Sequence, residues 1–209
     1  ESWAAEARVA LEFLTLRGSS SDFEDAFVIT TPHSSATHRM AQHTSDALTR
    51  MVEATIIRDR GSFARLERLW PDAHTAGRRS MLNALGDSRD VEAAPLLTRL
   101  LGGDTPTDIL VLIRLAKAGR QRLAPLDDAS YERIRTYLRR EEPKLRAAAA
   151  QALGRLDDQA SVQELIHMLE DKDADVRVGV HFALKLLTAM TLDASTRPWT
   201  SWYESERRW

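Results

Sequence analysis

The chain contains no cysteine, and this absence removes several classes of chemistry. A thiolate nucleophile, an iron–sulfur cluster and a cysteine zinc finger all need that residue. Long apolar runs are absent too: the most apolar segment, Ile109–Ile113, has five residues, against the roughly 20 that cross a bilayer as a helix. We therefore expect no membrane span. The printed sequence starts at Glu1 and its first methionine is Met40, so a signal peptide removed before Glu1 stays possible and the compartment stays open.

Neither sign of charge dominates the chain. Lys and Arg number 29, Asp and Glu 31, and the formal net charge is -2. Nucleic-acid-binding domains usually carry a basic surplus, so the balance argues against a globally basic surface and leaves only a local patch possible. The densest basic stretch contains Arg133, Arg135, Arg139, Arg140, Lys144 and Arg146. Glutamates interrupt it, which favours a solvated face with ion pairs over phosphate binding.

Signals for β-strands are almost missing. Only Phe27–Thr31 has an extended pattern, and Pro32 follows it directly. Elsewhere apolar residues recur at helical spacing, in segments of roughly 10–16 residues. The sequence therefore predicts an all-α fold.

These helical segments repeat along the chain. One column consists of Leu66, Leu97, Ile134 and Leu165, with spacings of 31, 37 and 31 residues. A second column, with the same spacings, consists of Trp70, Leu101, Leu138 and Leu169. The longer third unit places about six extra residues in the loop Gly119–Asp128. Four aligned units are therefore expected.

Each unit has the pattern of two helices joined by a turn. In the last unit the first apolar stripe is Val162, Leu165, Ile166 and Leu169, and the second is Val176, Val180, Ala183, Leu184 and Leu187. Thr105 with Pro106, and Pro143 after Glu142, are expected helix starts. A single helix pair cannot bury both of its faces, so neighbouring pairs must stack. This stacking predicts an α-solenoid.

The segments Glu142–Gly154 and Asp173–Arg177 resemble HEAT repeats of the short bacterial type, also called phycobiliprotein-lyase HEAT-like repeats. The likeness lies in one pattern: an acidic turn, then Leu-Arg or Val-Arg, then an alanine-rich helix that ends in Leu-Gly. It spans roughly residues 45–190. The resemblance implies a right-handed superhelix of helical hairpins. One unit departs from the pattern, with Thr107-Asp108-Ile109 where Val-Arg would stand.

Three regions are expected from this pattern. Residues 1–44 form an N-terminal helix and an irregular cap, and residues 45–193 form about four to five HEAT-like helical pairs. Residues 194–209 resemble the Trp-rich final helix that closes many bacterial HEAT-repeat proteins. Trp199, Trp202 and Tyr203 would cover the apolar end of the last repeat, because terminal repeats need such a cap.

Metal sites and catalytic constellations find little support. His33, His38 and His43 are five residues apart, a spacing that directs them to different sides of a helix or a strand. Asp171, Asp173 and Asp175 imitate half of a calcium loop. That loop lacks its glycine and its bidentate glutamate, and helix capping explains the aspartates. No His-Glu pair, P-loop or dinucleotide-binding glycine pattern is present. We expect no catalytic residue, no metal and no cofactor.

The resemblance implies a non-enzymatic scaffold whose second helices line a concave surface that binds a peptide or a protein. Candidate contacts are Arg79, Asn83, Arg114, Lys117, Gln151, Arg155, His181 and Lys185; the alternative for several of them is that they only keep the surface soluble. Arg146 and Arg177, at equivalent positions, are expected to form a ladder between successive repeats. The runner-up function is DNA binding or repair, similar to the HEAT-like alkylpurine DNA glycosylases. A bilin lyase rests on the name of the repeat alone. The oligomeric state stays open.

Overall fold

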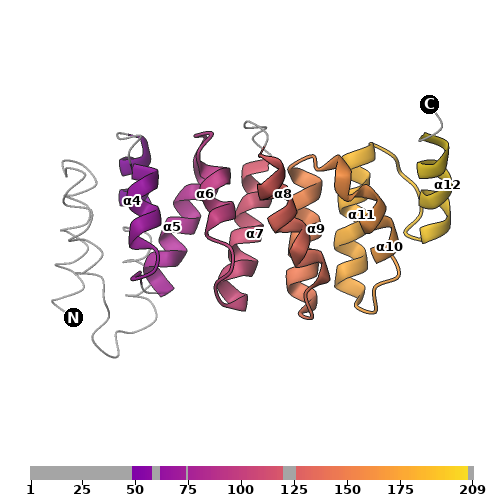
Figure 1. Ribbon diagram of the computed structural model, residues 1–209, viewed down its shortest axis with the longest axis horizontal. Helices are drawn as coiled ribbons and strands as arrows, with labels where there is room; N and C mark the ends of the chain where they lie inside the picture. The colour runs from indigo at the N-terminus through magenta and orange to yellow at the C-terminus, as the bar shows by residue number, and fades with distance from the viewer. Residues whose placement is uncertain (1–48, 58–61, 74, 120–125, 207–209) are drawn as a thin grey trace. The chain divides into compact units, whose positions relative to one another are not determined.

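The computed structural model describes residues 49–57, 62–73, 75–119 and 126–206 (Figure 1). Within these ranges every regular element is helical and no strand occurs. The extended pattern at Phe27–Thr31, the expected N-terminal helix and the three evenly spaced histidines lie outside the described residues. The chain divides into two compact units, Glu1–Leu96 and Leu97–Trp209, and each is described by itself.

The first unit contains a helix over residues 49–57, then α4 (Ser62–Leu69), α5 (Thr75–Asp87) and the start of α6 (Ala93–Arg99). Its fully buried side chains include Val52, Leu66, Met81, Leu82, Leu85 and Leu96. Arg78 lies over the ring of Trp70 at 5.3 Å and donates to the backbone carbonyls of Trp70 and Pro71. The turn between α4 and α5 is therefore held by an arginine of the helix that follows it.

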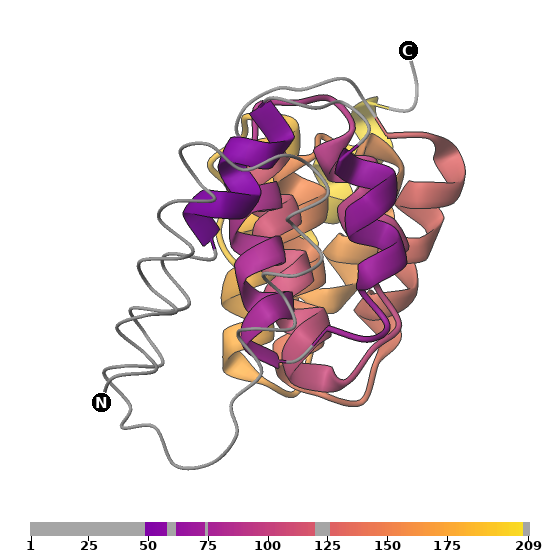
Figure 2. The same ribbon diagram turned by 90° about the vertical axis from the view of Figure 1, so that its left-hand side faces the viewer.

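The second unit begins within α6, contains eight further described elements and is built around three long helices. These three are α7 (Thr105–Gly119), α9 (Pro143–Arg155) and α11 (Ala174–Thr188). The shorter elements are α8 (Asp128–Arg135), η1 (Thr136–Arg139), η2 (Gln159–Ser161), α10 (Val162–Met168) and α12 (Thr196–Glu206). α9 lies between α7 and α11, and α8 and α10 pack beside them (Figure 1). In Figure 2, turned by 90°, the three long helices lie one behind another as a single layer. Successive helix pairs make this unit an α-solenoid, as the sequence predicts.

The repeating columns of the sequence form the core. Leu66, Leu97, Ile134 and Leu165 are each at most 2% exposed. Leu101, Leu138 and Leu169 of the other column are also buried, whereas Trp70 is half-buried beneath Arg78. Both apolar stripes predicted for α10 and α11 are buried at every position. The repeat period therefore identified core positions correctly.

Small residues allow the three long helices to approach closely. A Cβ placed on Gly154 of α9 would lie 2.7 Å from the Cα of Ala183 in α11. One placed on Gly119 of α7 would lie 2.6 Å from the carbonyl oxygen of Arg155. Both contacts involve backbone atoms, which cannot rotate away. Because the ends of neighbouring helices meet in this way, α7, α9 and α11 run in the same direction.

Helix starts follow the expected chemistry with one shift. The Asp173 carboxylate accepts from the backbone N–H groups of Asp175 and Val176 and caps α11. Pro143 begins α9 directly after Glu142, as predicted. The cap of α7 is Asp104, whose carboxylate accepts from the N–H of Thr107 at 2.8 Å, and not Thr105. Thr105 is already the first helical residue, because the Asp104 carboxylate accepts from a free N–H group of the first turn from just outside the helix.

The C-terminal helix α12 contacts α10 and buries Trp199 completely. The Trp199 indole N–H donates to the carbonyl of Asp193 at 2.8 Å, and its ring meets His181 edge-on with 6.1 Å between ring centroids. Trp202 stacks edge-on against Trp199 in the same helix. The helix begins at Thr196, so Pro198 lies in its first turn.

Candidate partner-binding surface

The outer face of the layer α7–α9–α11 exposes large apolar side chains. Ile113 of α7 is 49% exposed, and Val178 and Phe182 of α11 are 69% and 38% exposed. Together with six neighbours they line a hollow of about 500 Å³. The complete lining is Ile113, Ala116, Lys117, Ala148, Gln151, Arg155, Val178, Gly179 and Phe182. We call this hollow the α7–α9–α11 groove.

Three of the eight predicted contact residues meet in this groove. Lys117, Gln151 and Arg155 come from the C-terminal halves of α7 and α9. They meet because the two helices run side by side in the same direction. Arg155 holds its guanidinium over the Phe182 ring, 4.9 Å from the ring centroid, and so joins α9 to α11 at the edge of the groove.

The other predicted residues lie elsewhere. Arg114 is half-buried on α7 and Lys185 is exposed on α11, and neither lines the groove. The His181 ring faces the C-terminal segment, where its Nε2 lies 2.8 Å from the Leu192 carbonyl oxygen and its edge meets Trp199. Arg79 and Asn83 belong to α5 of the first unit, where Arg79 is exposed and Asn83 is half-buried.

Sequence reasoning missed the apolar part of the groove. Val178, Phe182 and Leu186 are spaced four residues apart on α11 and form an exposed stripe separate from the buried one. A search for polar contacts on the second helices passes over them. The available signal was a helix with more apolar residues than one buried face can hold.

The basic stretch around α8 and α9 connects neighbouring repeats. Arg135 binds the buried Asp158 carboxylate, with 2.8 Å between Nε and Oδ2, and Arg139 binds Glu164. Arg133 donates to the carbonyl of Leu101. Hydrogen bonding to Asp158 raises the pKa of Arg135. Arg135 and Arg139 form ion pairs, as the sequence indicates. Of these pairs only Arg135–Glu132 lies within one helix, and the pairs with Asp158 and Glu164 join successive repeats.

Arg146 makes the inter-repeat contact that the ladder prediction requires. Its guanidinium is 8% exposed and binds both carboxylate oxygens of Asp171, at 2.9 and 2.8 Å. It also donates to the carbonyls of Arg140 and Glu141. The bound guanidinium lowers the pKa of Asp171 below its ordinary value of 3.8. Asp171 is thereby engaged in the fold, as Asp173 is by capping α11.

Arg177 differs from this prediction. Its hydrogen bonds go to the carbonyls of Asp171 and Lys172, within its own turn. Arg146, in contrast, contacts its own turn at Arg140 and Glu141 and also the acidic turn of the next repeat at Asp171. Arg177 forms no ion pair with a carboxylate among the described residues, so the ladder does not continue from this position.

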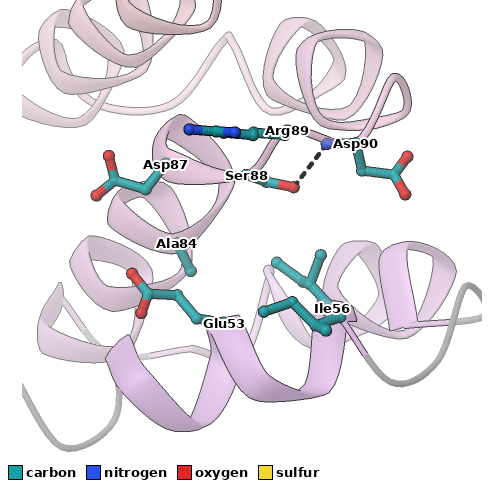
Figure 3. A pocket seen from close by; sticks show the side chains of 8 residues that line it. Glu53, Ile56, Ala84, Asp87, Ser88, Arg89 and Asp90 are labelled. Atoms are coloured by element: carbon teal, nitrogen blue, oxygen red, sulfur yellow. Dashed lines mark hydrogen bonds between the residues drawn. The ribbon is translucent and has the colours of Figure 1, made fainter.

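The first unit has a hollow of its own, of about 630 Å³ (Figure 3). Glu53, Ile56 and Ile57 line one side from the helix over residues 49–57, and Ala84 and Asp87 line the other from α5. Ser88, Arg89 and Asp90 complete the lining, and the Ser88 hydroxyl accepts from the Asp90 N–H at 3.1 Å. No group of three metal-ligating side chains was found among the residues that the structure describes. Over the same residues, no helix has the length and apolar character of a membrane span.

Comparisons with known proteins identify HEAT repeats in part of the chain. The sequence profile of the family described as HEAT repeats (HEAT_2) matches residues 105–185, which run from α7 into α11. A search of curated proteins found no match to the chain. Among solved structures, the chain is similar to the crystal structure of an engineered protein, Northeast Structural Genomics Consortium target OR329. The TM-score is 0.54 and the identity 18%, over 89% of this chain and 90% of that one.

These matches agree with the helix pairs, the buried columns and the inter-repeat ion pairs. HEAT repeats commonly mediate protein–protein interaction, and HEAT scaffolds are generally non-catalytic. Residues 105–185 match the HEAT-repeat family, and the all-helical repeat fold is consistent with a HEAT-like repeat protein.

Proposed function

We propose that this protein is a non-enzymatic scaffold that binds a peptide or protein partner in the α7–α9–α11 groove. The observation that carries the proposal is the exposure of Ile113, Val178 and Phe182 around one hollow. Exposed apolar side chains that gather at a concave site, with polar groups beside them, are typical of surfaces that bind partners. The use of HEAT repeats as protein-binding modules supports the same function.

The test is selection from a random-peptide display library on the immobilised full chain. Selected peptides are then measured in solution against Val178→Asp, which places a carboxylate at the most exposed apolar position of the groove. We expect binding to weaken roughly tenfold or more, as at a contact that dominates an interface. Val91→Asp is the matched control, because Val91 is 51% exposed and lies outside the groove. Equal loss of binding in both variants would contradict the proposal.

DNA binding is the competing function and needs its own measurement. An exposed Phe182 beside Arg155 is a pair that could stack on a base, so duplex and single-stranded oligonucleotides are both tested. Binding through phosphates weakens steeply with salt. We expect no shift of either oligonucleotide at low salt, and salt-sensitive binding by the wild type that Arg155→Gln abolishes would favour the DNA function instead.

A further inference from the structure

The α7–α9–α11 groove combines positive charge with apolar surface. Lys117 and Arg155 are its charged residues, and none of the described residues that line it is acidic. Both lie in the last turn of their helices. Because α7 and α9 run in the same direction, the two cations lie at the same end of the layer. Val178 and Gln151 lie further from that end.

The positions of these cations have an ordinary structural explanation, which is the negative end of the helix dipole. That explanation does not account for the exposed apolar side chains beside them. An occupant that satisfies both features needs negative charge at one end and a large apolar group at the other. The groove has too few cations to follow a phosphate backbone, and that backbone has no apolar group for Ile113 and Val178 to contact.

Arg155 adds geometric selectivity. The central carbon of its guanidinium lies over the Phe182 ring, 4.9 Å from the ring centroid. Carboxylates are recognised by the N–H edge of a guanidinium, often through two parallel hydrogen bonds. The contact with Phe182 restrains the guanidinium at the groove edge, which lowers the entropy cost of binding a carboxylate there.

We propose that the groove binds a short acidic peptide segment, whose carboxylates contact Lys117 and Arg155 and whose large apolar side chain packs among Ile113, Val178 and Phe182. This proposal rests on the proposed function, and it adds the chemistry of the partner. Charge complementarity is the argument that selects an acidic segment over a neutral or basic one.

The experiment compares matched synthetic peptides on the full chain by fluorescence anisotropy. The parent peptide is an acidic sequence with leucine and phenylalanine, taken from the display selection. One derivative replaces Asp and Glu by Asn and Gln, and a second replaces the large apolar residues by alanine. We expect each derivative to bind at least tenfold more weakly, because each loses one of the two contacts. The acid-dependent part should also decline as salt rises.

Two protein variants locate the charge contact. Lys117→Gln and Arg155→Gln should each weaken the parent peptide several-fold and leave the Asn and Gln derivative almost unchanged. Arg139→Gln and Lys172→Gln are matched controls, because both residues are exposed and lie outside the groove. Thermal melts accompany every variant, since Arg155→Gln also removes the contact with Phe182. Lys117→Gln keeps that contact, and its thermal melt separates a loss of peptide binding from a loss of stability.

The outcomes separate this proposal from the proposed function. One outcome is that selected peptides need Val178 for binding, show no excess of Asp and Glu, and bind Lys117→Gln and Arg155→Gln as they bind the wild type. That result would overturn the acidic partner and support the proposed scaffold function. Selected peptides that bind Val178→Asp as tightly as the wild type would overturn both the acidic partner and the proposed function. Preference for an oligonucleotide over every peptide at physiological salt would also overturn both.

Discussion

At the scale of single residues, the turns between helices are held by two opposite hydrogen-bonding schemes. In three repeats an arginine donates to the carbonyls of its own turn: Arg78, Arg146 and Arg177. In the repeat that contains α7, Ile109 occupies the position that aligns with these arginines. The preceding residue, Asp108, holds the turn instead. Its buried carboxylate accepts from the N–H groups of Gly102 and Gly103. The departure in the sequence therefore reverses the polarity of the turn while the turn itself persists.

Asp108 also reaches the next repeat. Its second carboxylate oxygen accepts from the Tyr137 hydroxyl at 2.7 Å. Burial and this hydrogen bond raise the pKa of Tyr137 to about 12. This repeat has Ile109 where the others have the turn arginine. Here Arg133 of α8 donates to the Leu101 carbonyl. The sequence shows that the turn arginine is missing from this repeat. It could not show the contacts of Tyr137 and Arg133, because these residues lie about 30 residues from their partners.

The first prediction compares the two equivalent arginines. Arg146→Gln removes a bidentate ion pair with Asp171 and two hydrogen bonds to backbone carbonyls. The half-buried Asp171 carboxylate then loses this cationic partner. We expect it to lower the free energy of unfolding by about 3 kcal/mol. Arg177→Gln removes only bonds to its own turn and should cost about 1 kcal/mol. Urea denaturation followed by circular dichroism measures both, and equal losses would show that the ion pair contributes little.

The second prediction concerns pH. Arg146 lowers the pKa of folded Asp171 below 3.8, so the folded state binds this proton less readily than the unfolded chain does. The resulting stabilisation is complete above the unfolded pKa and disappears as pH falls through the folded one. The stability gap between wild type and Asp171→Asn should therefore be constant above about pH 5 and shrink below about pH 4. Denaturation curves across this range test it, and a gap that widens in acid would contradict the assignment.

At the scale of helices, contact between α9 and α11 depends on the missing side chain of Gly154. Two alanines take part in the close approach of these helices: Ala183 lies against Gly154, and Ala147 lies against Gly179. The sequence predicts this close approach from composition alone. It could not reveal which position has no space left, because that depends on how far each helix is displaced along its neighbour.

The third prediction tests that position. Gly154→Ala gains helix propensity, about 1 kcal/mol, but places a methyl group 2.7 Å from the Ala183 backbone. We expect a net loss of about 1–2 kcal/mol, because overpacking outweighs the gain. Gly179→Ala is the matched control, since its closest neighbour would be the Ala147 carbonyl oxygen at 3.3 Å. A stabilised Gly154→Ala, measured by thermal melting, would mean that α9 and α11 can move apart easily.

At the scale of the whole molecule, the sequence predicted the class of fold better than it predicted the site. The core columns recur at spacings of 31, 37 and 31 residues, and burial follows these columns. The groove depends on which side chains three parallel helices bring together, and only Lys117, Gln151 and Arg155 of the eight candidates meet there. His181 has the spacing of a surface contact, yet its ring contacts Trp199 from a distant part of the chain.

Repeat proteins transmit stability mainly between neighbours, because each repeat contacts only those beside it. The fourth prediction follows from this property. In Arg146→Gln, hydrogen exchange should accelerate most in α9, α10 and α11, which adjoin the lost ion pair with Asp171. The helix over residues 49–57 and α4, which belong to the other compact unit, should exchange at wild-type rates. Equal acceleration along the described chain would instead show that both units unfold in one cooperative step. In that case the Arg146 pair would stabilise the whole chain, and the nearest-neighbour picture would not hold for this protein.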